Sequence, residues 1–465
     1  MYRFNNKRKL AKELSVRKAF KFSMLAAVMF IISTYAPLSF GAVSPEEAAK
    51  LGTTLTGVGA EMAGNKDGTI PPYTGGLTTP PASFKPGSGK RPDPFAHEKP
   101  LFSINAQNMH QHADKMTEGA KALMKRFPNY RIDVFKTHRT VAFPDFVLKN
   151  TLKNAVNAKT TNDGLTLNDA HAGIPFPIAK TGSEAMWNHL TRYQGLAHST
   201  RADTWIVDRN GRPILTGRVK KFFQFPYYDT SVSSSDIYYM VTFDYNGPAR
   251  HAGERVLLID PLNAAEKSRK VWQYLPGQRR TKLAPEIAFD TPLNGTGGVT
   301  NWDDAELFNG SMERFNWKLI GKKEIYIPYN CYKNYFSTMA DFTPNFFNPD
   351  VVRWELHRVW IVEATLKQGK RHNYHRRTFY LDEDTWAAAA SDNYDAHGNI
   401  YRIGFDMPIY NYDERAVFTM PTLFFDMMTN TYAMVYWMGE GSVTYTTPLP
   451  MRRWSADMIS AGGVR

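Results

Sequence analysis

The chain has 465 residues and a formal net charge of +13, with 43% hydrophobic and 22% charged residues, which is the composition of a folded globular protein. This composition excludes a chain that is disordered throughout and a protein with many membrane spans. The single cysteine, Cys331, excludes an intramolecular disulfide and a zinc site built from cysteines. The length predicts about two or three domains.

The first residues carry much of the positive charge. Residues 1–23 hold eight basic side chains against Glu13 alone, which is +7 of the total, and an apolar run over 24–35 follows. Small residues then lead to Ala42, an order typical of a secretory signal. The apolar run is shorter than the about 20 residues of a membrane-spanning helix. We therefore predict a cleaved signal peptide over residues 1–41 and a periplasmic mature protein without nucleic-acid partners; an N-terminal helix of the mature fold and an uncleaved anchor are the alternatives.

Residues 42–130 are predicted to precede the main domain. Ser44 to Gly52 has the pattern of a short helix with a serine N-cap, a proline at its first position and a glycine at its exit. Residues 64–94 contain six glycines and seven prolines, too many for regular elements, and indicate an extended arm that lies over the body or acts as a linker. An apolar stripe from Met109 to Phe127 predicts an amphipathic helix that Pro128 ends.

Residues 131–465 are predicted to form the main domain. A second helix is predicted over 184–194, with Ser183 as its N-cap, and the apolar period then changes to two. Asn210-Gly211 and Asn246-Gly247 are dipeptides that favour type I′ hairpins. Strands are predicted over 204–207, 214–225, 238–245, 254–259, 270–274, 279–283, 317–320, 324–328, 351–366, 376–381, 386–392 and 400–405.

The longest predicted strand, 351–366, alternates along its length. Its even positions include Trp354 and Leu356, whereas Glu355 and His357 fall on the other face, which predicts one apolar and one solvent-facing side. Short antiparallel strands with helices ahead of them predict a mainly β, α+β fold: one strongly curved antiparallel sheet or open barrel capped by helices. A parallel α/β fold is disfavoured because no helical stretch separates successive strands.

Motifs for catalysis and cofactors are weak. No glycine motif stands between a strand and a helix, and no G-x-S-x-G elbow occurs. His372 and His375 have no carboxylate nearby at ligand spacing. We therefore predict no catalytic residue, no cofactor and no metal site. The acidic cluster of Asp303, Asp304 and Glu306 fits a helix start better than an acid–base pair.

The apolar strand faces are the more informative feature. A wide, half-open sheet lined by aromatic side chains leaves room for an acyl chain, whose burial contributes about 0.8 kcal/mol per methylene. The residues predicted to line this cavity are Trp187, Tyr239, Phe243, Trp354, Leu356, Trp360, Val362 and Phe379. A plain hydrophobic core between sheet and helices accounts for the same pattern, and the sequence leaves both interpretations open.

Three strings carry a family resemblance: RKVWQYLPGQRRTKLAP (269–285), WDDAELFNGSMERFNWKLIGKKEIYIPYN (302–330) and RTFYLDEDTWAAAASDNYDAHGNIYR (377–402). They resemble an uncharacterised family of Gram-negative periplasmic proteins labelled outer-membrane lipoprotein-sorting protein and grouped with the LolA-like and LolB-like carriers. The resemblance extends to VSPEEAAKLGTTLT and DGTIPPYTGGL near the N-terminus. It implies a half-open, LolA-like barrel with helices plugging its mouth, a cavity for acyl chains, and association with export pumps.

The leading hypothesis is a periplasmic carrier or chaperone that shields a lipid or lipoprotein acyl chain and needs no covalent chemistry. Its expected partners are the hydrophobic ligand, an export pump or outer-membrane protein, and transiently a membrane. An enzyme acting on a hydrophobic substrate through Asp303, Asp304 and Glu306 is one alternative. The other is an envelope scaffold that binds its partner through the arm over residues 64–94.

Overall fold

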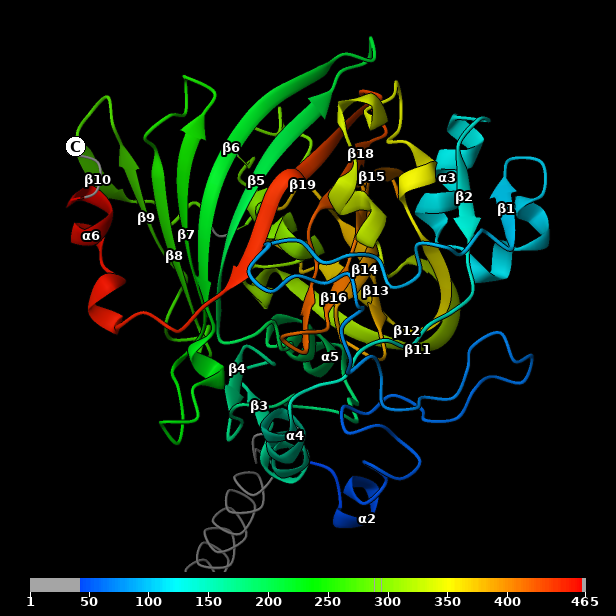
Figure 1. Ribbon diagram of the computed structural model, residues 1–465. Helices are drawn as coiled ribbons and strands as arrows, with labels where there is room; N and C mark the ends of the chain where they lie inside the picture. The colour runs from blue at the N-terminus through cyan, green and yellow to red at the C-terminus, as the bar shows by residue number, and fades with distance from the viewer. Residues whose placement is uncertain (1–41, 288, 294, 462–465) are drawn as a thin grey trace, which may run out of the picture. The chain divides into compact units, whose positions relative to one another are not determined.

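A long, strongly curved sheet dominates the computed structural model, which describes residues 42–287, 289–293 and 295–461 (Figure 1). The predicted signal peptide lies outside the described residues. The sheet has 15 strands. They are β1 (Phe102–Asn105), β2 (Arg131–Val134), β5 (Ala197–Val207), β6 (Pro213–Gln224), β7 (Ile237–Gly247), β8 (Arg255–Pro261), β9 (Lys270–Leu275), β10 (Arg280–Leu283), β11 (Phe315–Pro328), β12 (Trp354–Leu366), β13 (Arg376–Asp382), β14 (Ala388–Tyr394), β15 (Ile400–Asp406), β18 (Thr422–Asp426) and β19 (Thr431–Tyr445).

The strand order explains how the two halves of the chain meet. It runs β1-β2-β12-β13-β14-β15-β18-β19-β5-β6-β7-β8-β9-β10, and β11 pairs with β12. Two antiparallel meanders, β5 to β10 and β12 to β15, are joined by β18 and β19, because β19 pairs with β5. A parallel pairing of β2 with β12 makes the sheet mixed, not purely antiparallel as predicted. The path has two ends, β1 and β10, so the sheet is curved and open, as expected for a mainly β fold.

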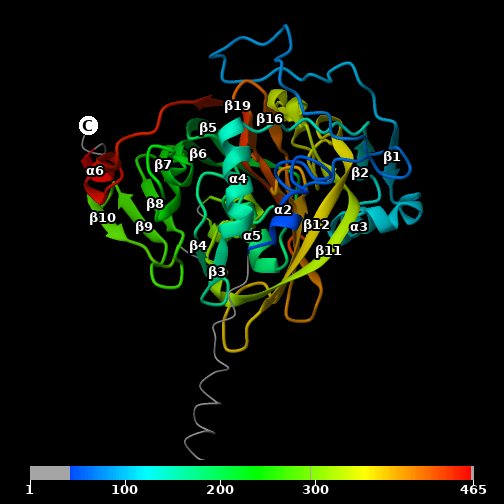
Figure 2. The ribbon, with the colours of Figure 1, turned by 90° about the horizontal axis from the view of Figure 1, so that it is seen from below.

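Helices and two small hairpins border the sheet. The hairpins are β3 (Lys159–Thr161) with β4 (Thr166–Asn168), and β16 (Ile409–Asn411) with β17 (Ala416–Phe418). The helices are α2 (Pro45–Ala48), α3 (Glu118–Arg126), α4 (Asp145–Asn157), α5 (Gly182–Leu190) and α6 (Ala456–Ala461). Helix α3 contacts β14 and β15, α5 contacts β11 and β12, and α6 contacts β8 to β10. Helices α2 and α4 contact each other, and both views place α4 and α5 at the same end of the sheet (Figures 1 and 2).

The predicted helices form with shifted starts. Ser44 caps α2 with a capping box that includes Glu47, as the sequence indicates. The stripe from Met109 divides into two short 3-10 turns and α3, whose N-cap is Thr117. Helix α5 starts at Thr181 instead of Ser183, because Thr181 and Glu184 form the capping box. Helix α4 was not predicted.

Three predicted turns are wrong in detail. Strand β11 runs through Gly321, where a turn was predicted, with a register shift between Leu319 and Gly321. Asn246 and Gly247 belong to β7 itself, so the connection to β8 is longer than a type I′ turn. At the first hairpin, Gly211 has a φ of 77°, whereas Asn210 stays outside the left-handed region. The Asp208 carboxylate shapes that turn by accepting from two backbone N–H groups.

The predicted solvent-facing side of β12 is also wrong. Glu355 and His357 are 0% and 1% exposed. The segments that flank the glycine- and proline-rich arm supply part of this cover, and the arm itself contacts the body through the ion pair of Arg91 with Asp413. Its neighbouring residue Glu98 pairs with Arg353 at 2.7 Å, and the carbonyl of Val58, just before the arm, accepts from Trp386 Nε1 at 2.9 Å. Polar side chains on that face are therefore satisfied by ion pairs instead of water.

The described residues form one compact unit. Most buried apolar residues belong to one cluster, and a smaller one lies between β6 to β9 and the C-terminal segment around Trp454. Among the described residues, no helix combines the length and the hydropathy that crossing a membrane requires.

Candidate ligand-binding site

A segment without strands, residues 284–314, packs against aromatic side chains of the sheet between β10 and β11, and we call it the covering segment; residues 288 and 294 of it lie outside the described chain. Its side chains Trp302, Leu307 and Phe308 are buried in the main core. Trp302 meets the Phe243 ring edge-on at 5.6 Å between centroids, and Phe308 meets Phe379 at 5.7 Å. The covering segment thus fills space beside residues that the sequence assigned to a ligand.

Ion pairs fasten the covering segment to the sheet. Asp303 lies 3.0 Å from Arg377 and 2.9 Å from His372, and Asp304 lies 2.8 Å from Arg377. Burial opposes ionisation of Asp303, but Arg377 and His372 outweigh it and hold the pKa of Asp303 at about 2. Burial raises the pKa of Asp304, the neighbour that shares Arg377. These contacts join a loop to β13 through side chains alone, without strand pairing.

Glu306 makes a second fastening. Its carboxylate accepts from Arg192, which follows α5, from Gln194 at 3.2 Å and from the Tyr239 hydroxyl at 3.4 Å. Glu306 has a φ of 53° and Leu307 a φ of 66°, left-handed conformations that are strained for residues with a side chain. The surrounding ion pairs hold this kink in place.

Helix α5 is joined to the same segment by a histidine. His189 Nε2 donates to the Phe308 carbonyl at 2.9 Å, and its Nδ1 accepts from the Ala388 N–H at 3.1 Å. Burial and the nearby Arg192 lower the pKa of His189 well below its usual value, so the ring is neutral, as this pair of bonds requires.

The acidic cluster behaves as a helix start. Residues 302–307 form short 3-10 turns, and Asp304 completes a capping box with Asn301. Asp303 and Asp304 share Arg377, and Glu306 pairs with Arg192. Asp303 and Asp304 therefore stand at the start of a short 3-10 turn, as predicted, whereas Glu306 lies at the left-handed kink that follows.

Two cavities adjoin the covering segment. One, of about 150 Å³, is lined by Trp187, Tyr238 and Met312 among others. The other, of about 20 Å³, is lined by Tyr239, Phe243, Trp302 and Glu306. Arg269 lines both, and its guanidinium is held by Asp260 through two bonds of 2.7 Å.

The eight residues predicted to bind a ligand are divided among several places. Trp187 lines the larger cavity, and Tyr239 and Phe243 line the smaller. The others are core residues of β12 and β13: Trp354 packs on Phe405, Leu356 pairs with Tyr326 in register, Val362 pairs with Phe379, and half-buried Trp360 stacks on Trp386. That they share one ligand stays a prediction.

A buried lysine lies at the smaller cavity. Lys221, in β6, is 1% exposed, and its Nζ donates to Met420 Sδ at 2.9 Å and lies 3.2 Å from the centre of the Tyr436 ring. No carboxylate of the described residues lies within ion-pair distance of it. Burial lowers the pKa of Lys221 well below its usual value, and Glu306 opposes this only in part.

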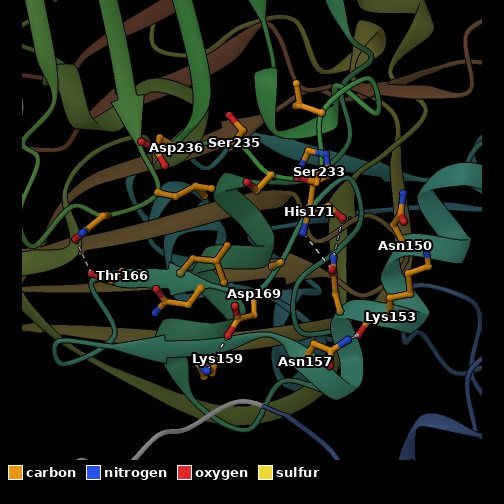
Figure 3. Close-up of a pocket in the computed structure, with 18 of the residues that line it drawn as sticks. Asn150, Lys153, Asn157, Lys159, Thr166, Asp169, His171, Ser233, Ser235 and Asp236 are labelled. Atoms are coloured by element: carbon orange, nitrogen blue, oxygen red, sulfur yellow. Dashed lines mark hydrogen bonds and ion pairs between the residues drawn. The ribbon is translucent and has the colours of Figure 1, made fainter.

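A separate, polar cleft of about 1160 Å³ is lined by helix α4, the β3–β4 hairpin and the loop before β7 (Figure 3). Helix α4 contributes Asn150, Lys153 and Asn157, and the loop before β7 contributes Ser233 to Asp236. Asp169 in this cleft pairs with Lys159 at 2.7 Å. This lining suits ligands that form hydrogen bonds instead of acyl chains. The cleft was not predicted from the sequence, because α4, which forms one of its walls, was not predicted.

Comparison with known proteins identifies the family. A family model described as "Protein of unknown function (DUF1329)" matches residues 103–460. The chain belongs to the DUF1329 family. An uncharacterized protein of Pseudomonas aeruginosa is 37% identical to this DUF1329 protein over 437 residues, which are 91% of this chain and 94% of the relative. The predicted membership of an uncharacterised family is confirmed.

Solved structures were also found for parts of the fold. A DUF1329 protein from Desulfovibrio piger is 13% identical, with a TM-score of 0.40 over 57% of this chain and 92% of that one. A putative outer membrane lipoprotein-sorting protein domain from Vibrio parahaemolyticus is 12% identical, with a TM-score of 0.41 over 60% and 97% of the two chains. A LolA superfamily protein from Nitrosomonas europaea is 10% identical, with a TM-score of 0.37 over 60% and 99%. The last two bear the names of the group that the sequence resemblance indicated.

The basic residues of the site were missed, although the strand pattern of this DUF1329 protein contains a signal for two of them, Lys221 and Arg377. Lys221 stands at the same parity as Val219 and Phe223, both buried, and Arg377 stands at the parity of buried Phe379. In a strand, residues two apart share a face. A charged side chain at an inward position of an apolar strand therefore marks a buried polar site, and period-two analysis finds it.

Proposed function

We propose that this DUF1329 protein is a carrier for an apolar or amphiphilic ligand, a lipid or a lipoprotein acyl chain, which it binds between the curved sheet and the covering segment. The observation that carries the proposal is the way in which this segment is attached. Buried ion pairs and a strained left-handed kink, not strand pairing, hold it against aromatic residues of the sheet. Such a segment can leave the sheet without unpairing any strand.

The two cavities indicate where a ligand fits. Their common wall is Arg269, and both are lined on one side by residues of the covering segment, Met312 in the larger cavity and Trp302 in the smaller. Moving the segment outward joins them into a single apolar groove that includes Trp187, Tyr239 and Phe243. The structure is then the closed state of the carrier, in which protein side chains occupy the ligand's place.

The polar groups of the groove suit an amphiphile. Arg269 and Lys221 lie along the apolar lining, and an anionic headgroup favours the charged form of Lys221 that burial now disfavours. Helix α5, through His189 and Arg192, is the element that plugs this groove in the proposed LolA-like arrangement. Residence in the periplasm, delivery to an export pump or outer-membrane protein, and transient membrane contact complete the proposal.

Ligand recovery and dye binding test the proposal. Protein purified without detergent is expected to release lipid into organic extracts, and native mass spectrometry is expected to show the adduct. Glu306→Gln weakens the contact with Arg192 and is expected to increase binding of the apolar dye N-phenylnaphthylamine several-fold. Asp236→Asn, which removes an exposed pair with Lys267, is the matched control. Empty extracts together with no dye binding in wild type or Glu306→Gln would overturn the proposal.

A further inference from the structure

A second cluster of chemically active side chains lies in β12 and in the turn after β13, away from the covering segment. His357, Asp382 and Asp384 each offer one donor atom, and these atoms lie within 4.8 Å of one another. The three residues are 1%, 1% and 4% exposed. No metal site was predicted from these residues: the histidine and the two aspartates are far apart in the chain, and only the pairing of β12 with β13 brings them together.

One donor of the cluster has no partner in the described structure. Asp382 Oδ1 makes no hydrogen bond, and neither does the Tyr329 hydroxyl, whose ring stacks on His357 at 3.8 Å. Asp382 and Tyr329, but not His357 or Asp384, line a cavity of about 10 Å³, a space for about one water molecule. An unpaired carboxylate oxygen in a dry interior costs free energy, so its presence calls for a ligand.

The distance between His357 and Asp382 suits two ligands of one ion. His357 Nδ1 lies 3.9 Å from Asp382 Oδ1. This is too long for a hydrogen bond, which needs about 3.2 Å or less. Two donors bound at about 2.1 Å from a tetrahedral zinc ion lie about 3.4 Å apart, so the two side chains must approach each other by about 0.5 Å to bind one ion.

The three donor residues are held by hydrogen-bond partners, as the ligands of a bound metal ion are. His357 Nε2 is hydrogen-bonded to Glu355 Oε2 at 3.1 Å, which leaves the Nδ1 lone pair facing Asp382. Thr385 Oγ1 donates to the other oxygen of Asp382 at 2.7 Å. Arg139 holds Asp384 at 2.6 and 2.9 Å, and each carboxylate oxygen keeps a second lone pair.

The surrounding network contains more carboxylates than permanent cations, an excess that a divalent cation would neutralise. Asp384 is paired with Arg139, Glu383 with Arg358, and Glu355 with Arg353, whereas Asp382 faces no lysine or arginine among the described residues. The network contains six carboxylates and four permanent cations. The carboxylates are those of Glu61, Glu98, Glu355, Asp382, Glu383 and Asp384, and the cations are Arg139, Lys322, Arg353 and Arg358. One divalent ion balances this excess when His357 and His138, which pairs with Glu98, are both neutral.

We propose that His357, Asp382 and Asp384 bind one Zn²⁺ ion, with the Tyr329 hydroxyl at a fourth position. Imidazole nitrogen with carboxylate oxygen is a donor set that suits zinc, whereas all-oxygen sets suit magnesium and calcium. The ion ties the β13–β14 turn to β12, beneath the chain at Val58 to Ala63, whose carbonyls accept from Trp386 and Arg358. Its role is structural.

The test uses the full mature chain, stripped with EDTA, dialysed, and then supplied with Zn²⁺ or, separately, Mg²⁺. We expect about one Zn²⁺ per chain by elemental analysis, a melting temperature raised by several degrees, and no effect of Mg²⁺. Asp382→Asn and His357→Gln are expected to lose both effects, and Glu363→Gln, on the same strand and paired with Arg376, is expected to keep them. Wild type that binds no zinc, or variants that still bind it with the same shift, would overturn the proposal.

A spectroscopic measurement decides the question where a variant fails to fold. X-ray absorption at the zinc edge of the wild-type protein is expected to show one nitrogen and two or three oxygen neighbours and no sulfur. A signal dominated by two or more imidazoles places the ion at other histidines and contradicts the site.

Discussion

Asp303 and Arg377 form a fully buried ion pair at 3.0 Å between the covering segment and strand β13. The same guanidinium also bonds Asp304 and the carbonyl of Leu307. A single side chain of the sheet therefore satisfies three acceptors of a segment that makes no strand pairing with it. This makes Arg377 a principal attachment point of the covering segment.

Replacing this arginine is expected to be severe. Arg377→Met leaves Asp303 with His372 as its remaining ionisable partner and Asp304 buried without an ion pair, and breaking a buried pair in this way costs about 3–5 kcal/mol. Urea unfolding measures the loss, and hydrogen exchange of residues 295–312 shows whether the covering segment detaches first. Arg212→Met, which removes an exposed pair with Asp208, is the control and is expected to change stability by less than about 1 kcal/mol. Equal effects of the two substitutions would contradict the role given to Arg377.

Lys221 is expected to reduce stability and to assist binding. Lys221→Met keeps the length of the side chain and removes a buried amine, so we expect stabilisation by about 1–3 kcal/mol. Because the folded pKa is lowered below the unfolded value, the unfolded chain binds more protons, and wild-type stability rises with pH toward 10.5. The advantage of Lys221→Met is therefore largest at low pH and smallest near pH 10.

Ligand binding separates this effect from a purely structural one. If Lys221 faces a headgroup, Lys221→Met binds an anionic amphiphile less tightly but binds the uncharged dye as well as wild type does. Unfolding curves at pH 6 and 9.5, together with the two titrations, supply the measurement. A variant that is destabilised at both pH values would show that Lys221 is needed for the fold.

Local patterns were enough for much of the sheet. The four strands from β12 to β15 were predicted with ends within three residues of those observed, because alternation and polar turns such as Asp382 to Asp384 are encoded locally. The pairing of β19 with β5 was not predictable, since it joins residues more than 200 positions apart. Helix α4 was missed because two of its apolar residues, Leu152 and Val156, are exposed and blur the stripe.

The polar interior shows where such reasoning stops. Alternation assigned His357 to the solvent side of β12, whereas chain from the N-terminal region covers that side and buries an ion network there. When a segment distant in sequence covers a strand face, the alternation of the strand's own residues does not reveal it. The same limit applies to the core beside Phe243 and Phe379, because Trp302 and Phe308 pack there from a loop whose position no local pattern predicts.

The only cysteine is expected to be inert in the folded protein. Burial raises the pKa of the Cys331 thiol to about 12, and its Sγ is in contact with the carbonyls of Tyr329 and Arg353. Ellman's reagent at pH 8 is expected to label the native protein only as fast as the protein unfolds, and labelling is expected to be complete in urea. Rapid labelling of native protein would show that the region around Cys331 opens locally.

Asp392 gives a prediction for the pH dependence of stability. It lies in β14 beneath α3, where its carboxylate accepts from the Gly119 N–H at 3.0 Å and from the Tyr380 hydroxyl at 2.9 Å. Burial raises the pKa of Asp392 from 3.8 to about 7 despite these bonds. The folded state therefore favours the protonated acid. Its stabilising contribution is complete below pH 4 and is lost as the pH rises through 7.

Asp392→Asn imitates the protonated acid and removes this dependence. The amide oxygen keeps the bond from Gly119, and the amide group can donate to Tyr380. A shift from 3.8 to about 7 corresponds to about 4 kcal/mol, so the variant is expected to gain up to that amount over wild type at pH 8 and almost nothing at pH 4. Unfolding in urea across this range provides the measurement, with Asp236→Asn, 81% exposed, as a control that should follow wild type. A constant difference between Asp392→Asn and wild type from pH 4 to pH 8 would mean that Asp392 is ionised in the folded protein throughout, with the N-terminus of α3 sufficient to hold its charge.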